Sequence, residues 1–547
     1  MTSTALPPAL LERLIADLGP ENVVAESDKV EAVSRTCIPY RQIPSVMAYP
    51  PSSDQVQKVV LAAREYNVPV WPVSTGKNFG YGEKTACYPG GITMVMDRMT
   101  RIWQVDEELG YAVIEPGVTY KQLNDHLKAT KSSLWADAAG TTEYASVLGN
   151  ALDKGRGLTP YADHFGCLCG MDVVLADGRI METGGGPEGN NAVRHAYKWG
   201  VGPYLDGLFG QSNLGIVVKA GIWLMPEPEC FDFCTFEYTA SDDRFGDFID
   251  DMRRLTFQGA VRSRPHLAND FAMMCILDQY PHDLLKGGRC LTEEATTAWR
   301  KQHGVARWTF GCGLYGSRAE VRFQKRMIKR VLGRYGRPQF IGVAIQDNWK
   351  GRFVRWVAPF ANRLMGKSDA FVQILIPAIN LFRGIATDHF VRQVYFKSHR
   401  EKPLTDIDPA RDQCGFLWIG PVVPFTSKRV NEGLAMAKEV FARHEFDFFM
   451  EVIIESPRSV LLLTGIFYER NDPQEIERAL AWYKEIRELF LDHGYPPYRV
   501  TTMSMPGSLE RNPVSRDFLA SLKQAVDPQN LIAPGRYGTP TRPPDDK

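Results

Sequence analysis

The chain has 547 residues, 44% of them hydrophobic and 23% charged, and its 64 Lys and Arg equal its 64 Asp and Glu. This length exceeds one ordinary hydrophobic core, so two or three domains are expected. Because the net charge is zero, nothing in it argues for nucleic acid or another acidic partner. Ten cysteines without a framework spacing favour buried thiols in a reducing cytoplasm over disulfides, and no metal site is expected.

Secretion and membrane insertion have no signal in the sequence. Residues 1–8 lack a basic n-region and an apolar h-region. No uninterrupted apolar stretch reaches the ~18–20 residues of a membrane-spanning helix. We therefore expect a cytoplasmic protein of enzyme size.

The first part of the chain alternates helices with short strands. Ser53 is the expected N-cap of a helix over 53–66, and Asp177-Gly178 is the expected turn of a hairpin over 171–181. Hydrophobic periodicity predicts further helices at 10–18 and 120–129, and strands at 68–72, 91–96, 102–105 and 111–114.

A change of composition at Pro226-Glu-Pro-Glu229 marks the expected end of a first domain, 1–226, with its core from about 45. A second domain is expected over 227–497, and 498–547 is too short for a core of its own and should pack back on the first. Strands mixed with helices, without regular βαβ repetition, predict an α+β fold. In the second domain we expect helices at 320–334, 431–443 and 473–492 and strands at 450–454 and 460–468.

The segment Val73-Ser-Thr-Gly-Lys-Asn-Phe-Gly-Tyr-Gly82 follows an apolar run and reads as an anion-binding turn. Glycine permits the positive φ and close approach that converging backbone N–H groups require. Its spacing is that of neither the common phosphate loop nor the dinucleotide fingerprint. We expect it to bind a pyrophosphate, with Tyr81 reaching towards the group on which the cofactor acts.

Four segments carry a resemblance to a known family. They are 74–82; Ser146-Val-Leu-Gly-Asn150 continuing to Gly157-Leu-Thr-Pro-Tyr-Ala-Asp-His164; Gln211-Ser-Asn-Leu-Gly-Ile-Val217 with Gly221-Ile-Trp-Leu-Met-Pro226; and Ala533-Pro-Gly-Arg536. Together they resemble the vanillyl-alcohol oxidase and 4-cresol dehydrogenase family of flavoproteins. The likeness covers most of 45–230 and again about 430–538, with a divergent middle.

The resemblance implies a PCMH-type FAD-binding fold with a cap (substrate) domain of antiparallel sheet flanked by helices. Arg536 matches a basic residue near the flavin N1/C2 edge, where it would stabilise reduced flavin; the alternative is a surface arginine. Lys77 reads as a helper rather than a direct ligand. The residues expected to bind FAD are Ser74, Thr75, Gly76, Lys77, Asn78, Phe79, Gly80, Ser146, Gly149, Asn150, Thr159, Tyr161, Gly215, Ile216, Val217 and Arg536.

In the family, two tyrosines and an arginine hold the oxygen of a para-substituted phenol, and Tyr81, Tyr498 and Arg499 match them. Three such donors favour phenolate over phenol. The resemblance then implies hydride transfer from the para side-chain carbon to flavin N5 and a quinone methide. The alternative is that all three are ordinary packed residues.

The sequence departs from the family where flavin is covalently linked. The linking histidine of the vanillyl-alcohol oxidase branch falls on Phe416, which cannot form that bond. The tyrosine of the other branch lies one residue from Tyr395 in a poorly matching stretch. Non-covalent FAD is therefore the favoured interpretation, with a Tyr395 link as the alternative.

The acid–base residues also differ. Val460-Leu-Leu-Leu463 replaces a pair of family histidines, which predicts an apolar pocket for a bulkier phenol. Glu451 matches an acidic position and is the catalytic candidate. The carboxylate expected near flavin N5 has no clear counterpart, and Asp137, Glu143, Asp388 and His389 remain alternatives.

The segment 350–402 carries ten Lys and Arg against three acids, with interleaved aromatic and aliphatic residues. Such a pattern suits peripheral membrane contact or entry of a lipophilic substrate; the alternative is a helix pair facing the core or a dimer interface.

Expected partners are a small phenolic or lipophilic substrate, a cytochrome or quinone electron acceptor and a second copy in a homodimer. The other functions left open are oxidation of a non-phenolic lipophilic alcohol or natural-product intermediate, and a flavin-binding or membrane-associated protein with reduced catalysis.

Overall fold

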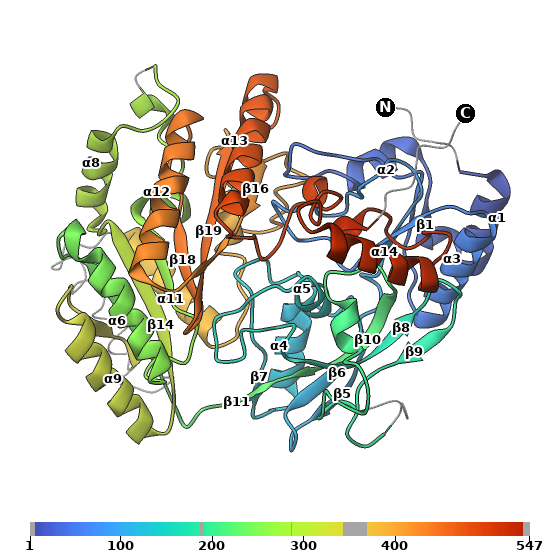
Figure 1. Ribbon diagram of the computed structural model, residues 1–547, viewed down its shortest axis with the longest axis horizontal. Coiled ribbons are helices and arrows are strands. Elements are labelled where there is room, and N and C mark those ends of the chain that lie inside the picture. Colours follow the sequence, from blue (N-terminus) through green and yellow to red (C-terminus); the bar gives the residue numbers. More distant parts are fainter. Residues whose placement is uncertain (1–5, 186–190, 286, 343–368, 540–547) are drawn as a thin grey trace.

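The computed structural model describes residues 6–185, 191–285, 287–342 and 369–539 (Figure 1). Its strands form three main sheets, and a cavity lies between the first two sheets and the third. The mixture of helices with largely antiparallel sheet confirms the predicted α+β class.

The first sheet has four strands in the order β1-β2-β4-β3, with β2 and β3 parallel to β4. Buried aliphatic side chains of two helices pack on it. Helix α3 begins at Ser53 as predicted, but its N-cap is one residue earlier than predicted, because the side chain of Ser52, not Ser53, accepts a hydrogen bond from the amide of Gln55. The elements are α1 (Pro8–Leu18), β1 (Val23–Val24), α2 (Ser27–Val33), β2 (Val46–Ala48), α3 (Ser53–Glu65), β3 (Val70–Val73) and β4 (Ile92–Val95).

The second sheet has five antiparallel strands in the order β5-β6-β10-β8-β9. Its β8–β9 pair, with Val174 opposite Ile180, confirms the predicted hairpin. The elements are β5 (Ile102–Asp106), β6 (Tyr111–Ile114), α4 (Tyr120–Ala129), α5 (Val147–Leu152), β8 (Leu168–Val174), β9 (Ile180–Glu182) and β10 (Ile216–Trp223), with a separate short pair of β7 (Leu134–Trp135) and β11 (Met225–Pro226).

The third sheet, here the cap sheet, is antiparallel and runs β15-β12-β14-β13-β18-β19-β16, with β17 also on β19. Helices α6 (Phe245–Phe257), α9 (Arg318–Leu332), α12 (Ser427–Arg443) and α13 (Pro473–Asp492) cover its outer face (Figure 1). The strands are β12 (Cys230–Tyr238), β13 (His266–Asn269), β14 (Trp308–Gly316), β15 (Gln339–Phe340), β16 (Gly415–Ile419), β17 (Val422–Pro424), β18 (Glu451–Ser456) and β19 (Ser459–Tyr468).

Three more helices, α7 (Asp270–Leu277), α8 (Glu293–His303) and α11 (Asp369–Phe382), belong to the same part of the chain. The C-terminal helix α14 (Pro513–Val526) lies instead beside the first sheet (Figure 1). After it, Val70 of β3 donates to the carbonyl of Leu531 at 2.9 Å and accepts from the amide of Ala533 at 2.8 Å. The chain therefore returns to its beginning, while the domain boundaries themselves stay predictions.

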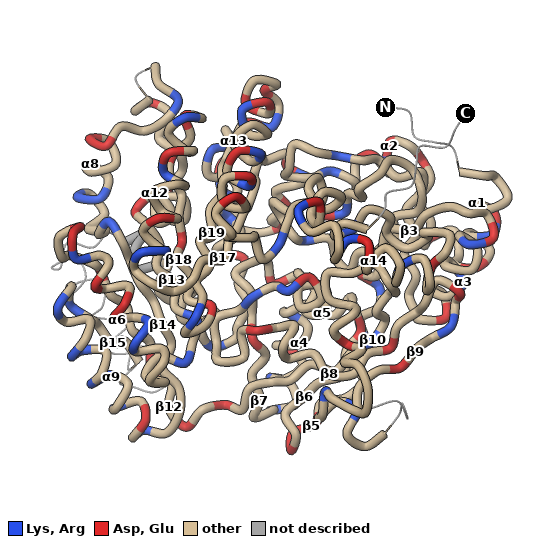
Figure 2. The backbone as a smooth tube through the Cα atoms, viewed as in Figure 1, with Lys and Arg blue, Asp and Glu red and all other residues tan. Residues whose placement is uncertain are grey.

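Acidic and basic residues alternate over the outer helices (Figure 2), which agrees with the zero net charge. Of the segment 350–402, residues 350–368 lie outside the described residues. In the described part, Ile374, Leu381 and Phe382 are buried, whereas Ile376 is 57% exposed. No helix among the described residues is long and apolar enough to cross a membrane; peripheral membrane contact stays a prediction.

Candidate active site

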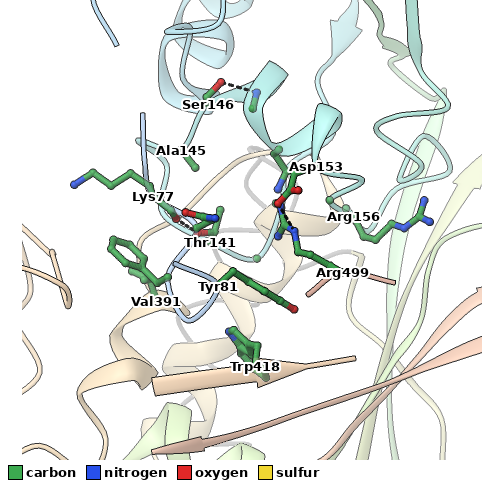
Figure 3. Close-up of a pocket in the computed structure, with 18 of the residues that line it drawn as sticks. Lys77, Tyr81, Thr141, Ala145, Ser146, Asp153, Arg156, Val391, Trp418 and Arg499 are labelled. Carbon is green, nitrogen blue, oxygen red and sulfur yellow. Dashed lines mark hydrogen bonds and ion pairs between the residues drawn. The ribbon is translucent and has the colours of Figure 1, made fainter. Parts of the chain in front are cut away.

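The cavity holds about 450 Å³ and draws its walls from both ends of the chain. One wall is the loop after β3 together with the start of α5 and the segment before β10. The opposite wall is the inner face of the cap sheet with α11, and residues 498–499 and 536–537 close one end. Figure 3 shows part of this arrangement around Tyr81 and Arg499.

The loop after β3 has the geometry of an anion-binding turn. Gly76 and Gly80 have φ angles of 65° and 80°, a backbone conformation that residues with a side chain rarely adopt. Among the described residues, no protein group accepts a hydrogen bond from the amides of 76–79. The side chain of Ser146 caps α5, and its amide donates to the Thr75 hydroxyl at 3.1 Å, so the two segments are held together. Free amides on a shaped turn fit the pyrophosphate of FAD.

Most of the residues expected to bind FAD line the cavity. Gly80, Thr159 and Tyr161 do not; Thr159 lies instead beside a buried pair of His164 and Asp137. Those that line it are Ser74, Thr75, Gly76, Lys77, Asn78, Phe79, Ser146, Gly149, Asn150, Gly215, Ile216, Val217 and Arg536.

Close approach between the loop and α5 explains the glycine at 149. A Cβ there would lie 2.0 Å from the Oγ atom and 2.9 Å from the Cβ atom of Ser74, so any larger residue would require Ser74 to move. Arg536 also belongs to the cavity wall rather than to the surface. Its Nη2 atom donates to the Pro72 carbonyl at 3.2 Å, and its guanidinium lies 4.2 Å from the centre of the Trp71 ring.

The three residues expected to bind a phenol oxygen lie together. The hydroxyl oxygens of Tyr81 and Tyr498 are 3.3 Å apart, and the guanidinium of Arg499 lies 4.7 Å from the centre of the Tyr81 ring. Burial raises the pKa of Tyr81 well above its usual value, with a further contribution from Tyr498, so this hydroxyl stays protonated. A protonated tyrosine can donate a hydrogen bond to a substrate oxygen.

Asp153, which follows α5, is a site residue that the sequence did not reveal. Its Oδ2 atom forms an ion pair of 2.6 Å with Nε of Arg499, and Figure 3 shows the pair in contact. The hydroxyl of Tyr537 donates to the same carboxylate. Burial alone would lower the pKa of Arg499, but Asp153 and the neighbouring tyrosines raise it, so Arg499 is a fixed cation.

Glu83 is a second residue that sequence reasoning missed, although it stands directly after the loop. Its side chain is buried, lines the cavity, and accepts hydrogen bonds from the Gly80 amide at 3.0 Å and from the Thr36 hydroxyl. Burial raises the pKa of Glu83 to about 7 against these hydrogen bonds. An acidic residue directly after a loop expected to bind an anion is the signal that could have marked it.

Lys77 and Tyr395 are engaged elsewhere. The Lys77 side chain points away from Tyr81 and Arg499 (Figure 3), and its Nζ pairs with Asp408 at 2.7 Å. Tyr395 is buried and does not line the cavity. Its hydroxyl donates to Oδ2 of Asp412 at 2.6 Å and accepts from the Asp408 amide at 3.1 Å. Non-covalent FAD stays the prediction, and a Tyr395 link stays its alternative.

The cap wall of the cavity combines apolar side chains with an acidic side chain and an imidazole. Phe416 and Trp418 of β16 and Leu461 and Leu463 of β19 face the cavity. Next to them lies Glu451, whose Oε2 atom is 3.7 Å from Nδ1 of His266, a residue that sequence reasoning did not single out.

The alternative acid–base residues do not line the cavity. Asp137 pairs with His164 at 2.7 Å inside the fold. Asp388 accepts from the Thr142 hydroxyl at 2.7 Å and from the Glu143 amide at 2.9 Å, which fixes a loop. Of the acidic candidates taken from the sequence, Glu451 is the one in the cavity wall.

Comparisons with known proteins agree with this geometry. Residues 44–184 match the FAD binding domain family. The chain is 30% identical to the 4-cresol dehydrogenase [hydroxylating] flavoprotein subunit of Pseudomonas putida, over 96% of this chain and 95% of the relative. The chain belongs to the vanillyl-alcohol oxidase and 4-cresol dehydrogenase family. It is therefore an FAD-dependent oxidoreductase, and FAD is its cofactor.

One further relative and two solved structures match this chain over nearly its full length. The 1'-carboxy-chondrochloren decarboxylase of Chondromyces crocatus is 33% identical, over 94% of this chain and 93% of the relative. The crystal structure of p-cresol methylhydroxylase with substrate bound has a TM-score of 0.85 at 27% identity, covering 97% of this chain and 96% of that one. The 4-ethylphenol oxidase of Gulosibacter chungangensis has the same fold, with a TM-score of 0.85 at 23% identity and 99% coverage of both chains.

Proposed function

We propose that this flavoprotein oxidises the para side chain of a 4-substituted phenol. The observation that carries the proposal is the convergence of Tyr81, Tyr498 and Arg499 at one end of the cavity, with hydroxyl oxygens 3.3 Å apart. Two neutral donors and a fixed cation stabilise a phenolate more than a phenol, because both hydrogen bonds and charge favour the anion. An alcohol lacking the phenol would gain little from this set.

The phenolate form makes the ring electron-rich and prepares the para carbon for oxidation. FAD, when bound, supplies the hydride acceptor at flavin N5. The resulting quinone methide of the substrate is resolved by water or by loss of a neighbouring proton, which gives an alcohol, an aldehyde or an alkene. In this proposal the amides of 76–79 hold the pyrophosphate and Arg536 stabilises the reduced flavin.

Oxidative decarboxylation is the second candidate, favoured by the 33% identity to a decarboxylase over most of the chain. If the side chain carries a carboxylate one carbon beyond the oxidised carbon, the bond to CO₂ can break instead of a C–H bond. The electron pair of the broken C–C bond forms the new double bond, and the ring oxygen becomes phenolate. This route therefore needs no proton acceptor. Leu461 and Leu463 line the cavity and belong to the run 460–463, which the resemblance sets against a pair of family histidines; such an apolar wall suits this route.

Two variants separate phenol oxidation from oxidation of a non-phenolic alcohol. In Tyr81→Phe and in Arg499→Ala, a phenol should bleach the flavin anaerobically at a rate roughly 10- to 100-fold lower than in the wild type. This is the effect expected from losing one strong hydrogen bond or charge. Bleaching by a non-phenolic lipophilic alcohol serves as the comparison. Unchanged rates with the phenol in both variants would refute phenolate binding.

A further inference from the structure

His266 and Glu451 form a polar pair on the inner face of the cap sheet. In the pairing of β13 with β18, His266 lies opposite Ile453 and Ala268 lies opposite Glu451, so the two side chains are diagonal neighbours on one face. The distance from Nδ1 to Oε2 is 3.7 Å, and both side chains line the cavity. Of the described residues that line the cavity, His266 is the one histidine.

Among the described residues, the other carboxylates in the cavity wall already have partners. Asp153 pairs with Arg499 and accepts from Tyr537. Glu83 is buried under the loop and accepts from Gly80 and Thr36. Glu451 and His266 are therefore the pair left to exchange a proton with a molecule in the cavity.

The sheet also places this pair at a suitable distance from the phenol-binding end. The ring of Tyr498 and the side chain of Leu461 both border Gly420. Leu461 on β19 lies opposite Ile453 on β18, which lies opposite His266 on β13. Since neighbouring strands are about 4.8 Å apart, His266 lies about 10 Å across the sheet from Leu461. A phenol with its oxygen at Tyr498 can direct its para side chain towards His266.

We propose that His266 is the catalytic residue that accepts the proton when the oxidised substrate is resolved, and that Glu451 orients its ring and stabilises the imidazolium. The proposal rests on the proposed phenol oxidation. In hydration, the water oxygen bonds to the side-chain carbon of the quinone methide, the displaced π electrons leave the ring oxygen as phenolate, and the water proton passes to His266. In alkene formation, the proton comes from the next carbon, and its C–H electrons form the new double bond.

The test is a single anaerobic turnover of holoenzyme with 4-ethylphenol, followed by flavin bleaching and by chiral analysis of the alcohol and its ratio to 4-vinylphenol. The flavin of His266→Asn should bleach at a rate within about twofold of the wild-type rate, because His266 acts after hydride transfer to the flavin. Its alcohol should be close to racemic, since water then adds without a positioned base, whereas the wild-type alcohol should be enriched in one enantiomer. Glu451→Gln should shift the products in the same direction.

His266→Gln guards against a folding artefact, since it keeps a hydrogen-bonding group without basicity and should match His266→Asn. The matched control is His389→Asn, a cap histidine that does not line the cavity, which should give wild-type products. Bleaching with unchanged enantiomer and alkene ratios in both His266 variants would overturn the role of His266 alone. Absence of bleaching in the wild type by any para-alkylphenol would overturn the proposed function and this role with it.

Discussion

Asp153 holds Arg499 through an ion pair of 2.6 Å between Oδ2 and Nε. The carboxylate comes from the end of α5 beside the expected FAD site, and the arginine comes from the segment that follows α13. The pair therefore joins the cofactor wall of the cavity to its substrate end. Because Tyr537 also donates to Asp153, the position of Arg499 depends on two residues that are far from each other in the sequence.

Asp153→Asn should weaken phenol binding, although Asp153 itself is not expected to touch the phenol. A neutral amide cannot balance the buried guanidinium, so Arg499 should lose its fixed orientation over Tyr81. The loss of one charge-assisted interaction is worth about 1.5–3 kcal/mol, which corresponds to roughly 10- to 100-fold in affinity. Titration of the flavin spectrum with a non-oxidisable para-substituted phenol measures it.

Asp163→Asn is the matched control for that substitution. Asp163 also pairs with an arginine, Arg156, at 2.6 Å, but its side chain is 53% exposed. Exposed ion pairs contribute little, so phenol affinity should stay within about twofold of the wild type. Equal losses of affinity in both variants would contradict the role assigned to Asp153.

Glu83 should make stability depend on pH. Burial raises the pKa of its carboxyl from 4.5 to about 7. Between these values the folded protein keeps a proton that the unfolded chain releases, so the stabilisation present below pH 4.5 is lost as pH rises through about 7. The upper limit of this loss is about 3 kcal/mol. Glu83→Gln should therefore unfold at a higher denaturant concentration than the wild type at pH 8, with the difference shrinking towards pH 5.

The exposed Glu12 provides the control for the Glu83 experiment. Glu12→Gln should leave the pH dependence of unfolding unchanged. A Glu83→Gln variant whose advantage over the wild type is the same at pH 5 and pH 8 would show that the carboxyl does not titrate in this range.

Tyr395 gives a prediction about the flavin linkage. Its hydroxyl is occupied by Asp412 and Asp408, and the residue does not line the cavity. The denatured protein should accordingly have its 61.5 kDa polypeptide mass without added FAD, and Tyr395→Phe should retain wild-type FAD content. A mass increase by one FAD that disappears in Tyr395→Phe would contradict non-covalent binding.

Local signals made several elements predictable from the sequence to the residue. Helix α4 begins after Thr119, which forms a capping box with Gln122, and α13 begins at Pro473 after the capping Asp472. Tyr81, Tyr498 and Arg499 could be assigned because their motifs resemble a family. Most of the residues that the same resemblance singled out for FAD line the cavity in the structure.

The missed residues have partners that only the fold brings near. Asp153 belongs to the site because Arg499 needs a counter-charge, and no spacing in the sequence connects the two. His266 faces the cavity through the register of β13 with β18, which a sequence does not specify. The apolar run 460–463 correctly suggested an apolar wall, but the polar pair beside it depends on strand order.

The central claim is that the substrate binds as a phenolate, and comparing a phenol with its methyl ether tests it most directly. Holoenzyme is mixed anaerobically with 4-ethylphenol or with 4-ethylanisole, and the flavin absorbance is followed. The account predicts bleaching by the phenol and at least 100-fold slower bleaching by the ether, because the ether cannot form an anion between Tyr81, Tyr498 and Arg499. Bleaching by the ether at a rate comparable to that of the phenol would contradict it.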